Sequence, residues 1–355
     1  MPPADSALLA VIEDAIGATI AQTRATAAPA GDVGMELVDA VEAAVAGGKR
    51  LRALAVMSSY AAHGGDSPKD IAPVAAALEL FQAAALVHDD VLDDAHTRRG
   101  RPTSHIAFAK AHAARGDEGN AERFGLAGAV LTGDLSLMVA MRAIAQAQLG
   151  EHGAATMRLF TEMTELVTVG QYLDMRIAAS PLTELPNQLD AIRATMRSKT
   201  ASYTAEFPLA LGASAARGDG PHVDAARAAG VPAGIAFQLR DDLLGLTGSP
   251  AVTGKPVGDD IREGKRTVPL WHAWTRTDAT GRAVIETALG EPSATEQQVQ
   301  AAIDVITDTG AIDAVEHEIA ELMSHVDGLV SHLDVSTQGR EQLAALLSGW
   351  GARAS

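Results

Sequence analysis

The chain has 355 residues, a length that suits one large domain or two small ones. Hydrophobic residues make up 47% and aromatic residues only 3%, so a core must be built mainly from aliphatic side chains, which favours closely packed helices. The net charge of −17 argues against a general nucleic-acid binder but leaves room for a local anion site. The absence of cysteine excludes disulfides, thiolate metal sites and a cysteine nucleophile, and it fits a cytoplasmic location.

The N-terminal stretch does not have the pattern of a signal peptide. It lacks the basic N-terminal region of a signal peptide, and its apolar stretch is interrupted by Glu13 and Asp14. We expect residues 1–30 to be a partly ordered segment and residues 31–355 to form a single helical domain.

Apolar residues recur at helical spacing through most of the chain, for example over Ile71–Leu92 and Leu126–Leu149. Clusters of glycine and proline separate these stretches, and no run of alternating residues indicates a β-sheet. The expected fold class is therefore all-α, a single-domain bundle of roughly ten or more helices. Residues 125–145 are the most membrane-like, but the charges of Asp134 and Arg142 favour a buried core helix and no stable membrane insertion.

An acidic cluster containing Asp89, Asp90 and Asp93 closes the first apolar stretch. Asp89 and Asp93 are four residues apart, so they share one face near the C-terminal end of a helix, where the dipole disfavours anions. A divalent cation would reverse this penalty, and oxygen ligands at this spacing suit Mg2+ bridging to a diphosphate. Taken alone, the cluster is equally compatible with a solvated helix end.

A second acidic cluster, Asp241 and Asp242, ends another apolar helical run. Two such clusters are harder to attribute to solvation than one, and if the two helices face each other they can hold a group of metal ions. Asp259 and Asp260 follow in a loop rich in glycine and proline, where we expect a turn rather than a metal ligand.

Basic clusters lie before, between and after the acidic ones. Each by itself is typical of a solvated surface, but the ordered set resembles the trans-isoprenyl diphosphate synthases, the polyprenyl synthetase family. The matching motifs, between Gly47 and Pro269, are GGKRLR, DDVLDD, RRGRPT, GDLSL, GQYLDM, SKT, FQLRDD and GKPVGDDIREGKRT. The resemblance implies an all-α isoprenoid synthase fold with a deep central cavity. It also implies a homodimeric prenyltransferase that adds isopentenyl diphosphate to an allylic diphosphate.

The resemblance further implies Mg2+ as the cofactor, with three ions in each active site. Asp89 and Asp93 would bind two ions on the allylic diphosphate with support from Asp90, and Asp241, beside Asp242, would bind the third. The chemistry agrees, because the allylic substrate must lose its diphosphate to form a cation. Water would trap that cation, which favours a deep apolar cavity.

The remaining motif residues are assigned by the same resemblance to the two substrates. The residues implied for the allylic diphosphate are Arg98, Lys199 and Lys255. Those implied for isopentenyl diphosphate, which does not ionise and so needs only basic groups, are Lys49, Arg52, Arg99 and the backbone of Gly48. Those implied near the reacting carbon are Thr200 and Gln238, and those implied to line the same cavity are Gln171 and Asp174.

Three positions depart from the family pattern. Gly245 stands where many relatives have a third aspartate of the second cluster. We expect activity to survive, because the first aspartate is the main ligand, with a weaker third metal site as the alternative. Gln82 stands where histidine is frequent; it can donate a hydrogen bond to a diphosphate oxygen, but without a positive charge. Ala53 replaces a frequent proline, with little expected effect.

The residues before the first acidic cluster predict the length of the product. Each helical turn advances about 5.4 Å, roughly one isoprene unit. Ala85 and Ala84 are too small to block a growing chain, and Phe81, one turn deeper, is the expected floor. In relatives a bulky aromatic residue at the position of Ala84 tends to stop growth at fifteen carbons, so we favour geranylgeranyl diphosphate over farnesyl or longer products. The alternative is that Leu78 or another helix forms the floor.

Two other functions are compatible with parts of this pattern. A class I terpene cyclase would share the helical fold and an aspartate-rich motif, but its Asn/Ser/Glu metal triad has no clear match here, and it would have no use for Lys49 and Arg52. A non-catalytic partner subunit would have lost its aspartates, whereas this chain keeps both acidic clusters.

Overall fold

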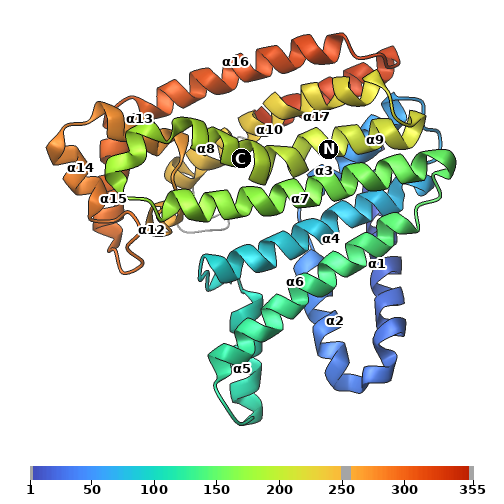
Figure 1. Cartoon of the computed structure of the whole chain (residues 1–355), viewed down its shortest axis with the longest axis horizontal. Coiled ribbons are helices and arrows are strands. Elements are labelled where there is room, and N and C mark those ends of the chain that lie inside the picture. The colour runs from blue at the N-terminus through green and yellow to red at the C-terminus, as the bar shows by residue number, and fades with distance from the viewer. Residues whose placement is uncertain (1–2, 249–256, 352–355) are drawn as a thin grey trace. The chain divides into compact units, whose positions relative to one another are not determined.

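A computed structural model describes residues 3–248 and 257–351, and most of these lie in helices (Figure 1). The helices of the first half are α1 (Pro3–Ala27), η1 (Ala28–Ala30), α2 (Gly31–Val45), α3 (Leu51–Ala62), α4 (Pro68–Leu92), α5 (Ser104–Arg115), α6 (Ala121–Ala145), η2 (Gly150–His152) and α7 (Gly153–Ala178). Those of the second half are η3 (Leu182–Asn187), α8 (Leu189–Thr195), η4 (Met196–Glu206), α9 (Phe207–Arg217), α10 (Pro221–Thr247), α12 (Asp259–Arg262), α13 (Val268–Arg276), α14 (Ala279–Glu286), α15 (Glu296–Asp308), α16 (Ala311–Ser331) and α17 (Thr337–Gly351). One hairpin of β1 (Thr97–Arg98) and β2 (Arg101–Pro102) is the β structure of the described residues. The all-α prediction is confirmed.

The chain divides into two compact units. Unit 1 comprises Met1–Leu159 with Pro208–Val223, and unit 2 comprises Phe160–Phe207 with Asp224–Ser355. The expected single domain over residues 31–355 stays a prediction, as does the partial order expected for residues 1–30. Within that segment α1 buries Ile12, Ile16 and Ile20, which recur once per turn and pack toward the rest of unit 1.

Helix α4 is the central helix of unit 1 and packs against α1, α3 and α6. Pro68, whose fixed φ suits the first helical turn, begins it. Its middle is rich in alanine, and Ala75, Ala76 and Ala77 are fully buried, so neighbouring helices approach closely. Helix α4 ends at Leu92, which places the first acidic cluster on its last turn.

Helix α6 packs one face onto α4 and α5 and exposes the other. Gly133 makes room for His88 of α4, because a Cβ at residue 133 would lie 2.1 Å from His88 Nε2. On the opposite face Leu131 is 54% and Met138 66% exposed, so the buried helix expected over residues 125–145 is buried on one side only. Helices α4 and α6 are both long and apolar enough to span a membrane, but α4 is mostly buried inside the protein.

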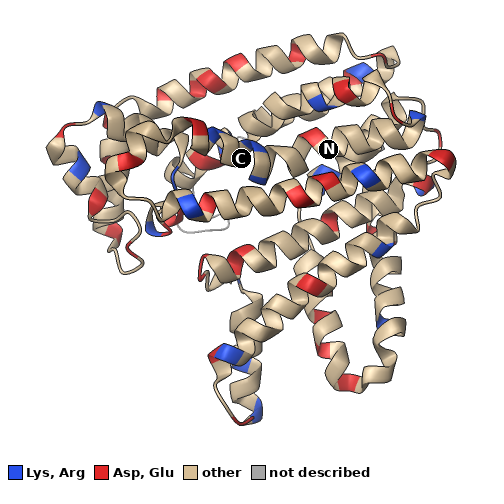
Figure 2. Ribbon diagram, viewed as in Figure 1, with Lys and Arg blue, Asp and Glu red and all other residues tan. Residues whose placement is uncertain are grey.

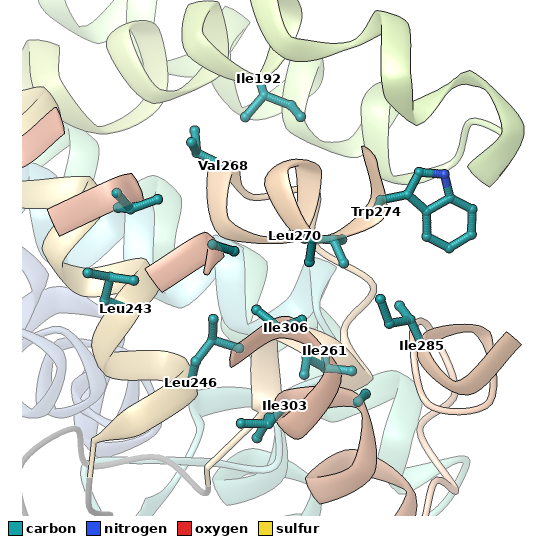
Figure 3. Close-up of a cluster of buried hydrophobic side chains, with 14 of the residues drawn as sticks. Ile192, Leu243, Leu246, Ile261, Val268, Leu270, Trp274, Ile285, Ile303 and Ile306 are labelled. Atoms are coloured by element: carbon teal, nitrogen blue, oxygen red, sulfur yellow. The ribbon is translucent and has the colours of Figure 1, made fainter. Parts of the chain in front are cut away.

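The core of unit 2 forms around the end of α10 and around α13 (Figure 3). Leu243 and Leu246 of α10 belong to this core, as do Val268 and Leu270 of α13. The other labelled members of this core are Ile192, Ile261, Trp274, Ile285, Ile303 and Ile306. This packing anchors the last turns of α10, which carry the second acidic cluster. Figure 2 shows acidic residues on helices throughout the described chain, in keeping with the net charge of −17.

Candidate active site

The first acidic cluster lies where α4 ends. Asp93 is the C-cap residue, and its backbone N–H donates to the carbonyl of Asp89 at 2.8 Å, so both side chains leave the same turn. The side chains of Asp89 and Asp90 are only 16% and 6% exposed. Arg98 of β1 offsets part of this negative charge, since its Nε donates to Asp90 Oδ1 at 2.6 Å and its Nη2 lies 3.7 Å from Asp89 Oδ2. Asp89, Asp90 and Arg98 thus lie together, an arrangement that suits a metal-bound diphosphate.

The β1–β2 hairpin connects this acidic cluster with the GGKRLR segment. Thr97 pairs with Pro102 and Arg98 with Arg101, which leaves Arg99 and Gly100 as a two-residue turn with φ of 51° and 71°. Left-handed conformations at both positions are typical of a type I′ turn. Arg98 therefore contacts the carboxylates, whereas the guanidinium of Arg99 lies by Gly48, where an added Cβ would be 3.5 Å from Nη1.

The GGKRLR segment links α2 to α3 and bends tightly. Gly47 and Gly48 have φ of 74° and 93°, a conformation that glycine adopts without strain. Lys49 is exposed, and Arg52, on the first turn of α3, is 7% exposed. Partial burial, followed by repulsion from the cations of Arg98 and Arg50, lowers the pKa of the Arg99 guanidinium. Crowded cations of this kind favour an anionic ligand, so unit 1 brings the residues predicted for isopentenyl diphosphate together.

The residues predicted to set product length lie on the preceding turns of α4. Phe81 is 3% exposed and Ala84 is fully buried, whereas Gln82 and Ala85 are half-buried. Ala85 lies one turn beyond Phe81 on the same face. The proposed role of these residues in setting product length stays a prediction.

In unit 2 the SKT motif lies in η4, a π-helix that the sequence did not indicate. Two helices approach its backbone through glycines: a Cβ at Gly170 of α7 would lie 2.5 Å from Lys199 N, and one at Gly234 of α10 would lie 2.6 Å from Ala201 Cα. Lys199 Nζ donates to Asp174 Oδ2 at 2.6 Å. Segments of π-helix are frequent at functional sites, and here one places a predicted diphosphate ligand against a predicted cavity residue.

The second acidic cluster continues this arrangement along α10. Gln238 lies one turn beyond Gly234 on the same face, and its Nε2 donates to Asp242 Oδ1 at 2.6 Å. Asp241 is exposed and Asp242 is buried. Burial, followed by repulsion from Asp260, raises the pKa of the Asp242 carboxyl well above its ordinary value. The surroundings of Asp242 therefore favour a bound cation or proton.

Asp260, which we expected in a turn rather than as a metal ligand, lies beside this cluster. It lies in the single-turn helix α12 and lines a small cavity together with Asp242 and Lys265. A Cβ at Gly245 would be 2.7 Å from Asp260 Oδ2, so Asp260 occupies the space in which a third aspartate of the second cluster would begin. Lys265 Nζ lies 3.5 Å from Asp260 Oδ1 and supplies a cation that was also missed. Only the close approach of Asp260 to Gly245 shows that Asp260 lies beside the second acidic cluster. The spacing of these residues along the sequence does not indicate it.

Gln171 and Thr200 are half-buried in α7 and η4, next to Gly170 and Lys199. Lys255 lies outside the described residues.

The donor groups fit magnesium bound jointly with a substrate. Among residues 3–248 and 257–351, no group of three or more acidic or histidine side chains is arranged to hold a metal ion. Mg2+ in diphosphate enzymes usually has one or two carboxylate ligands and takes its other oxygens from substrate and water. The paired carboxylates on α4 and on α10 each suit that role.

The helical fold, the two aspartate clusters and the basic segments around them are those of an enzyme that handles isoprenoid diphosphates. The sequence model of the polyprenyl synthetase family matches residues 35–306, and the chain belongs to this family. It is 31% identical over 309 residues to a geranylfarnesyl diphosphate synthase of Aeropyrum pernix, covering 85% of this chain and 89% of the relative. It is 37% identical over 233 residues to a geranylgeranyl diphosphate synthase of Mycobacterium tuberculosis, covering 65% and 60% of the two chains.

A solved structure agrees over nearly the whole chain. Geranylgeranyl pyrophosphate synthase from Corynebacterium glutamicum, crystallised with isoprenyl diphosphate and magnesium, superimposes with a TM-score of 0.91 at 35% identity. The match covers 98% of this chain and 99% of that one. The family predicted from the ordered motifs is therefore confirmed, and the chain is a prenyltransferase.

Proposed function

We propose that this chain adds isopentenyl diphosphate head to tail to an allylic diphosphate and that its product is geranylgeranyl diphosphate. The observation that carries the proposal is the β1–β2 hairpin of unit 1. Through Arg98 it contacts the carboxylates of α4, and through the neighbouring Arg99 it reaches the GGKRLR segment. Adjacent residues thus serve two anion sites, which a condensation of two diphosphates needs and a cyclase with one diphosphate substrate does not.

The side chains divide the work between the two substrates. Three Mg2+ ions are proposed, which Asp89, Asp93 and Asp241 would hold with Asp90 and Asp242 beside them. Bound there, the ions would supply the positive charge that offsets the charge developing on the leaving diphosphate. Arg98 and Lys199 hold that diphosphate, since each is a cation already placed beside a carboxylate of its own unit. Residues Lys49, Arg52 and Arg99 hold the second diphosphate without ionising it. Gln238 and Thr200 present dipoles to the cationic carbon, and the released diphosphate accepts the final proton.

Turnover of the purified chain tests this proposal. The protein is incubated with Mg2+ and dimethylallyl, geranyl or farnesyl diphosphate, with and without isopentenyl diphosphate. The products are identified by mass spectrometry. Geranylgeranyl diphosphate formed only when isopentenyl diphosphate is present supports the proposal. A cyclic hydrocarbon formed without it identifies a terpene cyclase, and a chain that is inert by itself identifies a non-catalytic subunit.

Replacing Ala84 by phenylalanine is expected to shift the main product from twenty to fifteen carbons. Ala84 lies one turn before the acidic cluster. The proposal has the growing chain run beside this helix, where a large ring at residue 84 would block it. Product masses from wild type and Ala84→Phe are compared on folded protein. Phe81→Leu is the complementary variant and is expected to lengthen the product, whereas Leu78→Ala is not. An unchanged product from Ala84→Phe would contradict the ruler.

We also propose that the enzyme is a homodimer that uses the exposed face of α6. Leu131 and Met138 lie seven residues apart on that face, and Phe124, Leu126 and Val130 add to it. An apolar helix face of this extent is typical of protein–protein contacts. Light scattering is expected to give twice the chain mass of 36.6 kDa, and a monomer at micromolar concentration would contradict the proposal.

A further inference from the structure

Arg50, in the middle of GGKRLR, is buried among partners of its own, although its charge still acts on Arg99. It is the N-cap residue of α3 and has a left-handed φ of 52°, which is strained for a side chain other than glycine. Its side chain is only 4% exposed, whereas Lys49 beside it is exposed. A strained residue with a buried charge persists only where its surroundings hold it firmly.

Three helices hold the Arg50 guanidinium. Its Nη1 donates to the carbonyl of Val45, the last residue of α2, at 2.7 Å and to Glu79 Oε2 of α4 at 3.2 Å. Its Nε and Nη2 donate to the two carboxylate oxygens of Glu13 in α1, at 2.7 and 3.1 Å. This bidentate pairing with Glu13 fixes both the position and the plane of the guanidinium.

Glu79 connects the same network to the start of α3. Its side chain is 4% exposed, and its Oε1 accepts the backbone N–H of Ala53 at 3.2 Å. Arg50 thus joins the ends of α2 and α3 through partners on α1 and α4, and the intervening residues 46–49 must follow the course that these contacts impose. The carboxylate of Glu79 also offsets a part of the positive charge that crowds around Arg99.

We propose that Glu13, acting through Arg50, is a positioning residue for the isopentenyl diphosphate site. Helix α1 precedes residues 35–306, which the family pattern covers, and its Glu13 holds the GGKRLR segment in the shape that presents Lys49 and Arg52 to the substrate. The inference rests on the proposed function, because it assigns those two residues to isopentenyl diphosphate. Under this proposal helix α1 contributes to recognition of isopentenyl diphosphate as well as to the hydrophobic core.

Glu13 can be changed without detaching α1. Its side chain is 53% exposed, so a substitution leaves no cavity. Helix α1 keeps the buried Ile12 and Ile16, and Arg142 Nη2 of α6 still donates to Thr23 Oγ1 at 2.7 Å. In Glu13→Gln an amide N–H2 replaces one carboxylate oxygen and removes the negative charge, so the pairing with Arg50 loses its bidentate, charge-assisted form.

The experiment compares Glu13→Gln with a matched control, Glu42→Gln. Glu42 of α2 is 54% exposed and accepts a hydrogen bond from Arg24 of α1, so it makes the same kind of interhelical contact away from the GGKRLR segment. KM is measured for isopentenyl diphosphate and for the allylic diphosphate, together with kcat and the melting temperature. For Glu13→Gln we expect a rise of about three- to fivefold in KM for isopentenyl diphosphate, with kcat and the allylic KM within about twofold of wild type. Glu42→Gln is expected to match wild type in both KM values and in kcat.

Other outcomes overturn the inference. An unchanged KM for isopentenyl diphosphate in Glu13→Gln, with or without a lower melting temperature, would show that the contact serves stability only. Equal rises in both KM values, or the same rise in Glu42→Gln, would show a general loosening of the fold. Wild-type protein that makes no product from isopentenyl diphosphate would instead refute the proposed function itself, before any variant is compared.

Discussion

Replacing Asp89 by asparagine is expected to lower kcat by about 10²–10³-fold, the cost of removing one group that stabilises charge in a transition state. Asparagine keeps the size of the side chain but removes the negative charge that a divalent cation requires. The fold should persist, because asparagine keeps the shape of the side chain and the 2.6 Å bond from Arg98 to Asp90 remains. Steady-state assays over a range of Mg2+ concentrations measure the effect.

Asp94→Asn is the matched control for this prediction. Asp94 belongs to the same acidic run, but its side chain is 90% exposed and its φ is 50°, a conformation that asparagine tolerates well. We expect its kcat to stay within about twofold of wild type, as for most surface substitutions. If the two variants lose activity equally, the cluster acts by bulk charge and Asp89 has no special part as a ligand.

Replacing Gly170 by alanine is expected to destabilise the protein by about 1–3 kcal/mol and to reduce activity at least tenfold, since overpacking shifts the backbone. The new Cβ would lie 2.5 Å from Lys199 N and 2.7 Å from Ser198 C, which are backbone atoms that cannot rotate away. Helix α7 and η4 must therefore separate, and the 2.6 Å contact between Lys199 and Asp174 is disturbed. Denaturant unfolding and kcat measure the two effects.

Gly328→Ala separates this steric effect from the general effect of alanine in a helix. Gly328 lies in α16, and a Cβ there would meet no atom within 4 Å. Alanine at that position is expected to stabilise the protein by up to about 1 kcal/mol and to leave kcat unchanged. If Gly170→Ala behaves like Gly328→Ala, the close approach of α7 to η4 does not hold Lys199 in place.

The helical fold and the placing of the first acidic cluster were open to prediction because they depend on local rules. Apolar periodicity marks α4, and Asp89 with Asp93 follows at a spacing that any helix converts into a shared face. The family resemblance added the family itself, since it rests on the order of several short motifs, and the two diphosphate sites that it implies stay predictions. Close contacts between residues that are far apart in the sequence were not predictable in this way.

The tertiary structure alone shows what Arg50, Asp260 and Gly170 do. Arg50 looks like a third cation of GGKRLR, yet partners 29 and 37 residues away turn it inward. Asp260 looks like a turn residue, yet it fills the space above Gly245. The sequence by itself determined the all-α fold class and which residues carry charge, because hydrophobic spacing acts over a few residues. Only tertiary packing determined which charged side chain pairs with which partner. A close approach between backbone segments that are distant in the sequence produces no periodic pattern of residues.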